Sequence, residues 1–439
     1  MLLFMTRLKR LLILSTMMLG TGQLSACGVA TPVPTATATA LPSLTPAIPT
    51  ATVSLPILSS TSTSTPSIPV ASAPDGLRMA YVIDGNLYFQ NGSNPPIQLT
   101  HSGEDDAPIF SDDGEKIVFR RGANPPFDRY SINIDGGGER AIVTTSKLMN
   151  LDFGYDGSTA APYATFVPGT HLLLFKTFQV QEAFLLSNND LLVVDTDTAK
   201  IKRLLPPGQI SSFYISPDGK FIAIDTIGSI DVIDLEGKLI HQNMLTYTPS
   251  EPSFLAPGIS WMPDSKGLLV ILPVPTFYET SASGPSYTVW RYFLDGGTGE
   301  QVPLDILPTE VYMATVSPDG NWIIYNNNDE YAFYIGDLRT GNTQLYEPKT
   351  FAFHYDWGWS PDSKHFIYRT SGKKLYLGSV NGSPELIGKG DFLGWIDSKR
   401  YLYHADKNIV MEDIKGSKEI IFADHESFKN RTIFAFILP

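Results

Sequence analysis

A short turn motif recurs along this chain and restricts its fold more than any other feature. The motif is the tetrapeptide Ser-(Pro or Asp)-Asp-(Gly or Ser), which occurs four times. Three further copies are variants of it. Proline presets φ, the aspartate carboxylate accepts backbone hydrogen bonds, and glycine tolerates a positive φ. An apolar run follows each turn, so each copy predicts two antiparallel strands joined by a tight turn. The copies begin at Ser111, Val167, Ser216, Met262, Ser317, Ser360 and Ile396.

Sequence for two more strands follows most of these turns. Residues 230–237, for example, read as a third strand that ends in an acidic turn, and residues 343–346 read as a short fourth strand. Four antiparallel strands that recur about every 40 to 55 residues are typical of a propeller blade. We therefore predict an all-β fold, a single β-propeller of four-stranded blades over residues 76–439.

The number of blades follows from counting first strands. A further unit at the start of the domain has only the last three strands, at residues 79–83, 86–90 and 97–100. The apolar residues 431–437 supply its missing first strand, which closes the ring and removes exposed sheet edges. This predicts eight blades, with seven as the alternative if one weak unit is an insertion. Complete units start near residues 107, 163, 212, 258, 312, 355 and 391.

The repeated turn resembles the WD40-like (PD40) repeat of the TolB family, and the propeller of dipeptidyl peptidase IV-type proteins is similar. The resemblance covers about residues 76–438 and rests on copies such as Ser216-Pro217-Asp218-Gly219-Lys220. It implies a propeller fold. It does not imply one function, because a propeller scaffold hosts many activities.

One face of the predicted propeller carries the long insertions. These fall between second and third strands or between blades, at residues 121–129, 144–161, 177–189, 243–257 and 274–287. Loops on a rigid scaffold often carry binding residues, and aromatic groups beside carboxylates suit a sugar, a peptide or a cationic group. The alternative is that these loops pack on one another over the channel mouth. The candidate binding residues are Phe127, Asp128, Arg129, Phe153, Tyr155, Asp156, Gln179, Glu182, Tyr247, Phe277, Tyr278 and Glu279.

The N-terminus has the pattern of a secretory signal peptide over residues 1–26. Basic residues, including Arg7 and Arg10, precede the apolar run 11–19, which is too short to anchor stably in a bilayer. Leu24-Ser25-Ala26-Cys27 resembles the bacterial lipobox, which implies lipidation of Cys27, the single cysteine of the chain. We expect an exported protein that is lipid-anchored to the cell membrane or cell envelope. The alternative is an ordinary signal peptide with a coincidental cysteine.

Residues 27–75 read as a flexible tether. Residues 28–74 contain no charged side chain and consist mostly of Thr, Pro, Ser, Ala and Val. This composition buries too little apolar surface to fold, so we predict a disordered linker that favours extended polyproline II.

The charge and the missing motifs restrict the function. A formal net charge of −13 disfavours nucleic acid as a partner. The sequence has no Gly-x-Ser-x-Gly elbow, His-Glu-x-x-His helix or phosphate loop, so we expect no catalytic residues, no cofactor and no metal site.

Two further patterns have an ordinary structural explanation. The acidic run Glu104-Asp105-Asp106 lacks calcium-loop spacing and reads as a turn. Trp357 and Trp359 share a strand face, where packing between blades competes with ligand stacking.

These features favour a non-enzymatic, membrane-anchored module that docks a protein or peptide on its loop-rich face. The alternative is an extracytoplasmic hydrolase or carbohydrate-binding propeller that uses carboxylates and aromatics at the channel mouth. Two carboxylates about 5–10 Å apart in a deep pocket would favour glycoside hydrolysis.

Overall fold

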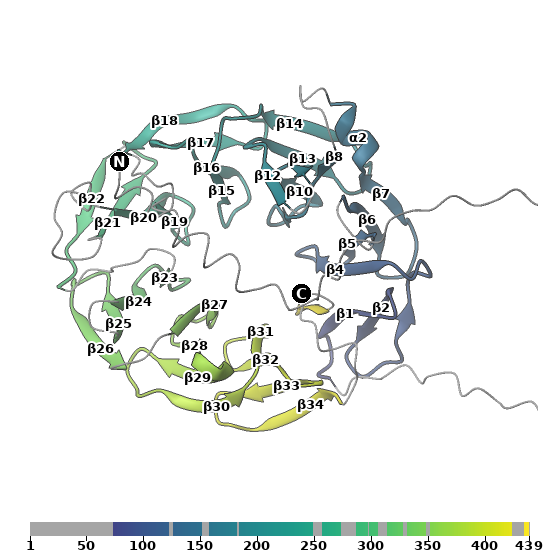
Figure 1. The fold of residues 1–439 in the computed structure, drawn as a ribbon. Coiled ribbons are helices and arrows are strands. Elements are labelled where there is room, and N and C mark those ends of the chain that lie inside the picture. The colour runs from purple at the N-terminus through teal and green to yellow at the C-terminus, as the bar shows by residue number, and fades with distance from the viewer. Residues whose placement is uncertain are drawn as a thin grey trace, which may run out of the picture. The chain divides into compact units, whose positions relative to one another are not determined.

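The computed structural model describes residues 73–122, 126–151, 158–181, 184–248, 257–273, 287–296, 298–305, 314–327, 332–347, 352–423 and 434–438. Within these residues, eight four-stranded antiparallel sheets follow one another in a ring (Figure 1). The predicted all-β, eight-bladed propeller is confirmed, and the seven-bladed alternative is wrong. The predicted signal peptide, Cys27 and the linker as far as residue 72 lie outside the described residues.

The first blade joins the two ends of the domain, as predicted. Strand β35 pairs antiparallel with β1, with Met79 opposite Phe436 and Tyr81 opposite Phe434. Because β35 covers the inner edge of β1, that edge is not left open to other chains. The blade contains β1 (Arg78–Ile83), β2 (Asn86–Asn91), β3 (Ile97–Gln98) and β35 (Phe434–Ile437).

The next three blades follow in chain order. The second blade contains β4 (Asp105–Phe110), β5 (Lys116–Arg121), β6 (Asp128–Asn133) and β7 (Arg140–Val143). The third contains β9 (Ala164–Phe166), β10 (Leu172–Phe175), β13 (Leu191–Asp195) and β14 (Ile201–Leu205). The fourth contains β15 (Ser212–Ile215), β16 (Phe221–Asp225), β17 (Ser229–Asp234) and β18 (Leu239–Thr246).

Four more blades complete the ring. The fifth contains β19 (Gly258–Trp261), β20 (Gly267–Pro273), β21 (Tyr287–Phe293) and β22 (Gly299–Val302). The sixth contains β23 (Ala314–Val316), β24 (Trp322–Asn327), β25 (Ala332–Asp337) and β26 (Thr343–Glu347). The seventh contains β27 (Ala352–Trp359), β28 (His365–Thr370), the 3-10 turn η4 (Ser371–Lys373), β29 (Lys374–Ser379) and β30 (Glu385–Lys389). The eighth contains β31 (Asp391–Trp395), β32 (Arg400–Ala405), β33 (Asn408–Asp413) and β34 (Lys418–Phe422).

The repeated turn is stabilised by its serine as well as its aspartate. In the fourth blade, Ser216 Oγ donates to Asp218 Oδ1 at 2.7 Å and accepts from the Phe221 amide at 2.9 Å. Gly219 has a φ of +70°, the conformation that the sequence predicts for the last turn position. The same serine–aspartate bond recurs at Ser111, Ser317 and Ser360.

The core lies between neighbouring blades. Between the sixth and seventh blades, Phe333 packs on Phe366 and Tyr368 with ring centroids 6.1 and 4.9 Å apart, and all three side chains are fully buried. Each buried side chain of this size contributes roughly 1.5–3 kcal/mol by leaving water. Trp359 is buried against Phe366 in the same cluster. Of the two roles considered for it, packing between blades is therefore the one observed. The side chain of Trp357 lies outside the described residues.

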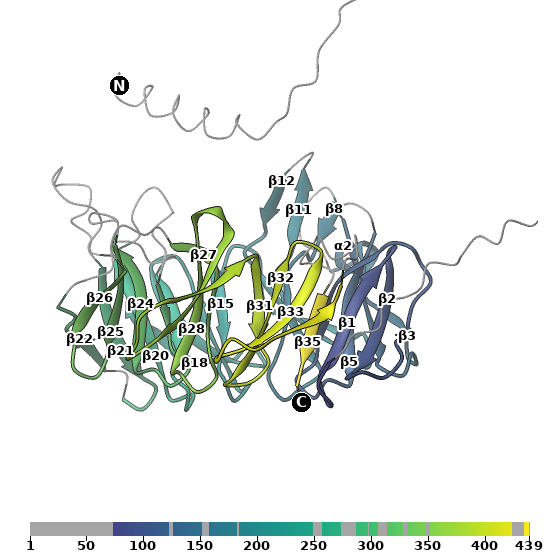
Figure 2. The ribbon, with the colours of Figure 1, turned by 90° about the horizontal axis from the view of Figure 1, so that it is seen from below.

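The two faces of the ring differ as predicted. The loops between second and third strands emerge on one side, called here the loop-rich face, and the repeated turns lie on the other, called the turn face (Figure 2).

The predicted insertion at residues 243–257 begins too early, because strand β18 continues to Thr246. Asn243 lies inside this strand at a φ of +50°, and its amide donates to Asp231 Oδ1 at 2.7 Å. The resulting bulge lets the strand continue where its sequence pattern breaks.

Candidate functional site

An additional small sheet stands on the loop-rich face of the third blade. Strands β8 (Ser158–Ala160), β11 (Phe178–Gln181) and β12 (Phe184–Ser187) form it in the order β12-β11-β8, and it rises beyond the blades (Figure 2). The hairpin of β11 and β12 occupies the predicted insertion 177–189. Strand β8 and the helix α2 (Thr145–Met149) occupy the predicted insertion 144–161. The described parts of these two insertions therefore form regular secondary structure.

A buried polar clamp fixes the base of this hairpin. Thr177 donates its amide to Asp190 Oδ1 at 2.8 Å and its hydroxyl to Asp190 Oδ2 at 2.6 Å. Asn188 Nδ2 donates to Thr177 Oγ1 at 2.8 Å. All three side chains are buried. Burial raises the pKa of Asp190, although the hydrogen bonds from Thr177 oppose the rise. The clamp makes the hairpin a rigid extension of the blade.

Exposed apolar side chains surround the small sheet. Met149 at the end of α2 is 60 % exposed, Tyr163 is 69 % exposed and Leu186 on β12 is 50 % exposed. Tyr163 also packs edge-on against Phe178 of β11, with centroids 5.8 Å apart. These four residues are called here the apolar crest. Leu186 pairs with Gln179, so its side chain lies on the opposite face of the small sheet from Phe178 and Tyr163. Exposed apolar groups on a rigid support commonly mark an interaction site.

Arg129, a predicted binding residue, is buried beneath this region. Its guanidinium donates to the carbonyls of Ala161 and Pro162, with the bond from Nε to Ala161 at 2.8 Å. Burial lowers its pKa to about 10, and the nearby charge of Arg120 adds to that effect. Asp128 accepts from the Thr145 amide at 3.0 Å. Both residues thus hold the connection to β8 and α2 in place.

A cavity of about 520 Å³ opens beside α2 on the same face. Its wall includes the Arg121 guanidinium, which lies 4.3 Å from the centroid of the Tyr130 ring. Arg121 also forms an ion pair with the buried carboxylate of Asp105 at 2.6 Å, so its charge is largely compensated. The residues that line the cavity are Glu104, Arg121, Gly122, Pro126, Asp128, Tyr130, Thr144, Thr145 and Ser146.

Three other predicted binding residues lie around the ring and do not converge in one pocket. Phe127 lies under the Arg120 guanidinium, 4.6 Å from the ring centroid. Gln179 is half-buried on β11. Tyr247 donates its hydroxyl to the buried Asp225 at 2.5 Å, and burial together with this carboxylate raises the pKa of Tyr247. The predicted residues that lie outside the described ones are Phe153, Tyr155, Asp156, Glu182, Phe277, Tyr278 and Glu279.

The acidic run was predicted as a turn, but Asp105 and Asp106 lie in strand β4, where arginines pair with them. Asp106 pairs with Arg120 at 2.5 Å, and Asp105 pairs with Arg121. Among the described residues, no three His, Cys, Asp or Glu side chains are grouped as metal ligands. In the same part of the chain no helix is long and apolar enough to cross a membrane.

Met149, Tyr163 and Leu186 were not predicted from the sequence, because the predicted residues were aromatic and charged side chains inside loops. These three are exposed on or beside a small sheet and a helix that the insertions form. The alternating pattern of residues 178–187 was the available signal for such a hairpin.

Similarity to solved structures concerns the fold alone. No protein-family model matches the chain. A eukaryotic initiation factor has a TM-score of 0.50 at 12 % identity, covering 79 % of this chain and 85 % of that one. Dipeptidyl peptidase 4 of Porphyromonas gingivalis has a TM-score of 0.48 at 12 % identity, covering 73 % and 53 %. TolB of Acinetobacter baumannii has a TM-score of 0.33 at 16 % identity, covering 70 % and 61 %.

One curated protein is similar over a short stretch. A B3 domain-containing protein of Arabidopsis thaliana is 29 % identical over 113 residues, which is 25 % of this chain. The chain spans 38 % of the length of that relative.

Proposed function

We propose that this chain is an exported, lipid-anchored and non-enzymatic binding module that docks a protein or peptide through its loop-rich face. The apolar crest carries this proposal. Leu186 exposes apolar surface on β12, and Met149 on α2 and Tyr163 between β8 and β9 expose more beside the small sheet. The clamp of Thr177, Asn188 and Asp190 holds the hairpin that carries Leu186. A rigid site loses little conformational entropy when a partner binds, so its apolar contacts contribute more to affinity.

The strand edge beside the crest supports a peptide or protein partner. β12 pairs with β11 on one side, and no described strand pairs with its other side. Such an edge offers backbone donors and acceptors to an added strand, while Leu186 offers an apolar contact beside it. The clamp fixes the orientation of both.

Site-specific photocrosslinking in the host membrane tests this docking. A photoreactive amino acid replaces Leu186 or Tyr163, and Leu345 on the outer strand β26, which is 51 % exposed, serves as the matched control. We expect the same partner to be crosslinked from both crest positions and not from Leu345. Equal labelling at all three positions, or none at the crest, would contradict the proposal.

The proposed anchor rests on the lipobox-like residues 24–27 and the uncharged tether that follows them. Lipid on Cys27 and a linker of this composition would hold the propeller near a membrane while leaving its faces accessible. Cys27→Ala should abolish metabolic labelling with a fatty-acid analogue and release the protein from membranes without unfolding it. Continued labelling of the variant would refute lipidation at Cys27.

A further inference from the structure

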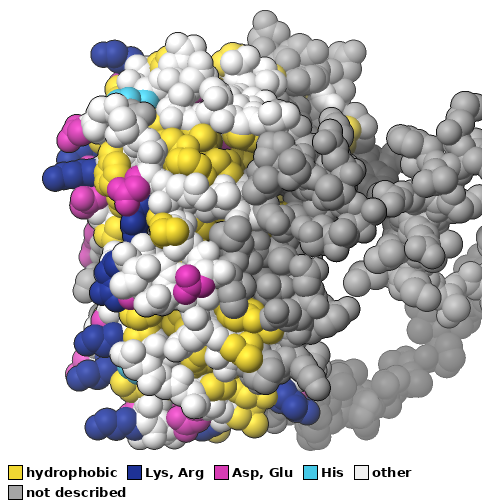
Figure 3. Space-filling model, turned by 90° about the vertical axis from the view of Figure 1, so that its left-hand side faces the viewer, with side chains coloured by type: hydrophobic (Ala, Val, Ile, Leu, Met, Phe, Trp, Pro, Cys, Tyr) yellow, Lys and Arg dark blue, Asp and Glu magenta, His cyan; other side chains and the backbone are white. Residues whose placement is uncertain are grey.

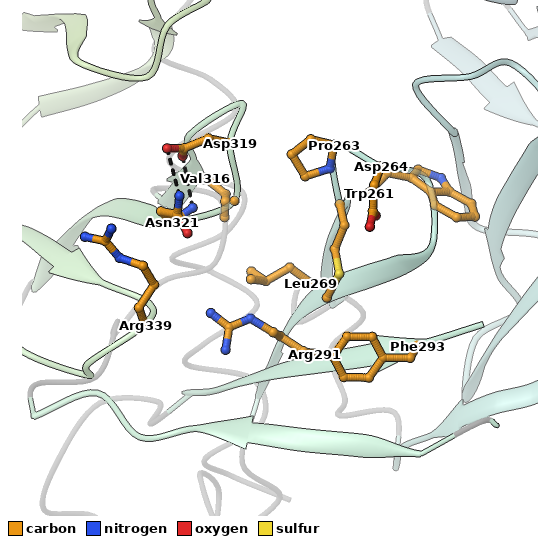
Figure 4. Close-up of a pocket in the computed structure, with 12 residues that line it drawn as sticks. Trp261, Pro263, Asp264, Leu269, Arg291, Phe293, Val316, Asp319, Asn321 and Arg339 are labelled. Carbon is orange, nitrogen blue, oxygen red and sulfur yellow. Dashed lines mark hydrogen bonds between the residues drawn. The ribbon is translucent and has the colours of Figure 1, made fainter. Parts of the chain in front are cut away.

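A cavity lies on the turn face, the face opposite the apolar crest. It has a volume of about 630 Å³ and lies between the fifth and sixth blades (Figure 4). This volume is in the range of small-molecule sites. The wall combines apolar side chains with two arginines and two aspartates. The lining residues are Trp261, Met262, Pro263, Asp264, Leu269, Arg291, Phe293, Val316, Asp319, Gly320, Asn321 and Arg339.

Arg291 occupies a position that is core in the other blades. In the fifth blade, Arg291 lies on β21 and pairs with Leu269, the third residue of β20. Strand pairing identifies the equivalent residue in each of the other six blades that contain the repeated turn, and each of these residues is small or apolar and buried. They are Ser131, Val193, Val232, Ile335, Leu377 and Met411.

The Arg291 guanidinium keeps binding capacity for a ligand. One Nη2 hydrogen is donated to the Leu338 carbonyl at 2.6 Å. Nη1 lies 3.7 Å from the carboxylate of Glu300, which is 64 % exposed, so this pair is long and well screened by water. Arg339 differs, because it forms two hydrogen bonds with Asp337 at 2.9 and 2.8 Å. Among the described residues that line the cavity, Arg291 therefore has more unused hydrogen-bond donors than Arg339.

A second departure from the repeat occurs at the same cavity. Where four of the other blades have the turn serine, the fifth blade has Met262, which adds apolar surface to the wall. Asp264 consequently lacks the serine hydroxyl that its equivalents accept, and it bonds the Lys266 amide at 3.0 Å. No side chain within the described residues donates to Asp264. The cavity wall therefore combines a cation, an apolar side chain and a carboxylate that receives no side-chain hydrogen bond from the described residues.

Arg291, Met262 and Asp264 together define the ligand chemistry. We propose that this cavity binds a small monoanionic carboxylate with an apolar body. The carboxylate lies on Arg291, which suits its planar geometry. The apolar body packs on Leu269, Phe293 and Val316. Asp264 and Asp319 in the wall repel polyanions, as does the net charge of −13, so one negative charge is selected over two or three.

The turn face carries charges of both signs. Lys and Arg side chains, with Asp and Glu side chains among them, lie along one edge of the side of the molecule seen in Figure 3. Lys220, Lys238 and Lys266 belong to turns of the fourth and fifth blades on the turn face. Lys220 pairs with Asp218 at 3.2 Å, so its positive charge is partly compensated.

Fluorine NMR of protein labelled with 5-fluorotryptophan tests the proposal. Trp261 lines the cavity, and Trp261→Phe assigns its signal. The probes are the N-acetylated forms of phenylalanine, leucine and methionine, each compared with its uncharged amide. At least one carboxylate should shift the Trp261 signal saturably at millimolar concentration. Its amide should bind about 10- to 100-fold more weakly, because a hydrogen bond to a charged group is lost.

Arg291→Leu is the decisive variant, since the seventh blade folds with Leu377 at the equivalent position. It should weaken carboxylate binding about 10- to 100-fold while thermal unfolding stays close to that of the wild type. Arg140→Leu, at an exposed arginine outside the cavity, should leave binding unchanged. The proposal is overturned if no carboxylate shifts the signal, if the amides or inorganic phosphate bind equally well, or if Arg291→Leu binds like the wild type.

Discussion

Single residues in this propeller often serve two neighbouring blades. His171 in the turn of the third blade contacts Asp197 of its own blade at 2.8 Å and Asp113 of the second blade at 3.0 Å. Lys116 of the second blade contacts Asp197 at 2.7 Å. Partial burial lowers the pKa of His171, but the hydrogen bonds and charges of both carboxylates outweigh it and raise the pKa above 6.5. The charged imidazole therefore ties the two blades together.

This contact predicts a pH-dependent effect of His171→Gln. A raised pKa means that the stabilisation is fully present below 6.5 and is lost as the pH rises through the folded-state pKa. The carboxylate of Asp113, whose pKa is lowered to about 2, stays ionised over this range. Urea denaturation should show a larger loss of unfolding free energy in the variant at about pH 5.5 than at about pH 9. His101→Gln, at an exposed histidine that contacts Gln98, should show no such difference; a loss for His171→Gln that does not vary with pH would contradict the ion-pair account.

Elements were easier to predict from the sequence than side-chain roles. The repeated turn and the apolar run after it specify the first and second strands, since an apolar strand can be buried only between blades. The hairpin β11–β12 was missed as an element because the insertion was interpreted only as a loop. Arg129 was predicted to lie on a binding surface. The sequence around Arg129 could not indicate that its guanidinium donates to the distant carbonyls of Ala161 and Pro162. Arg291 became conspicuous only when strand pairing aligned the blades.

The clamp below the β11–β12 hairpin predicts a local effect of Thr177→Val. The variant removes the hydroxyl that donates to Asp190 and accepts from Asn188, leaving buried polar groups unpaired at a cost of about 1–3 kcal/mol. Hydrogen exchange should accelerate in β11 and β12 and change little in β16 and β17. Thr165→Val, at an exposed position on β9, is the matched control and should leave both regions unchanged. Uniform acceleration across the propeller would show that the clamp supports the whole fold.

At the scale of the whole molecule, the ring depends on the pairing of its two ends. Phe434 and Phe436 of β35 contribute to the core cluster between the eighth and first blades, together with Tyr81 and Phe422. Gly394 on β31 leaves room for this strand, because a Cβ there would lie 2.8 Å from the Phe436 ring. Without β35, the inner edge of β1 and one side of this cluster would be exposed. The closure therefore couples a distant part of the sequence to the stability of the first blade.

Shortening the chain to end before residue 434 should therefore destabilise the first blade and promote self-association through the open edge of β1. Phe434→Ala, a milder change, should lower the free energy of unfolding by about 3–5 kcal/mol, since it removes a buried ring. The control is Leu438→Ala, because Leu438 lies beyond the strand and is 38 % exposed. It should lower the free energy of unfolding by much less than Phe434→Ala does. Denaturant titration measures both variants, and light scattering measures association of the shortened chain. A shortened chain that stays monomeric and as stable as the full one would mean that the blades hold together without the terminal strand.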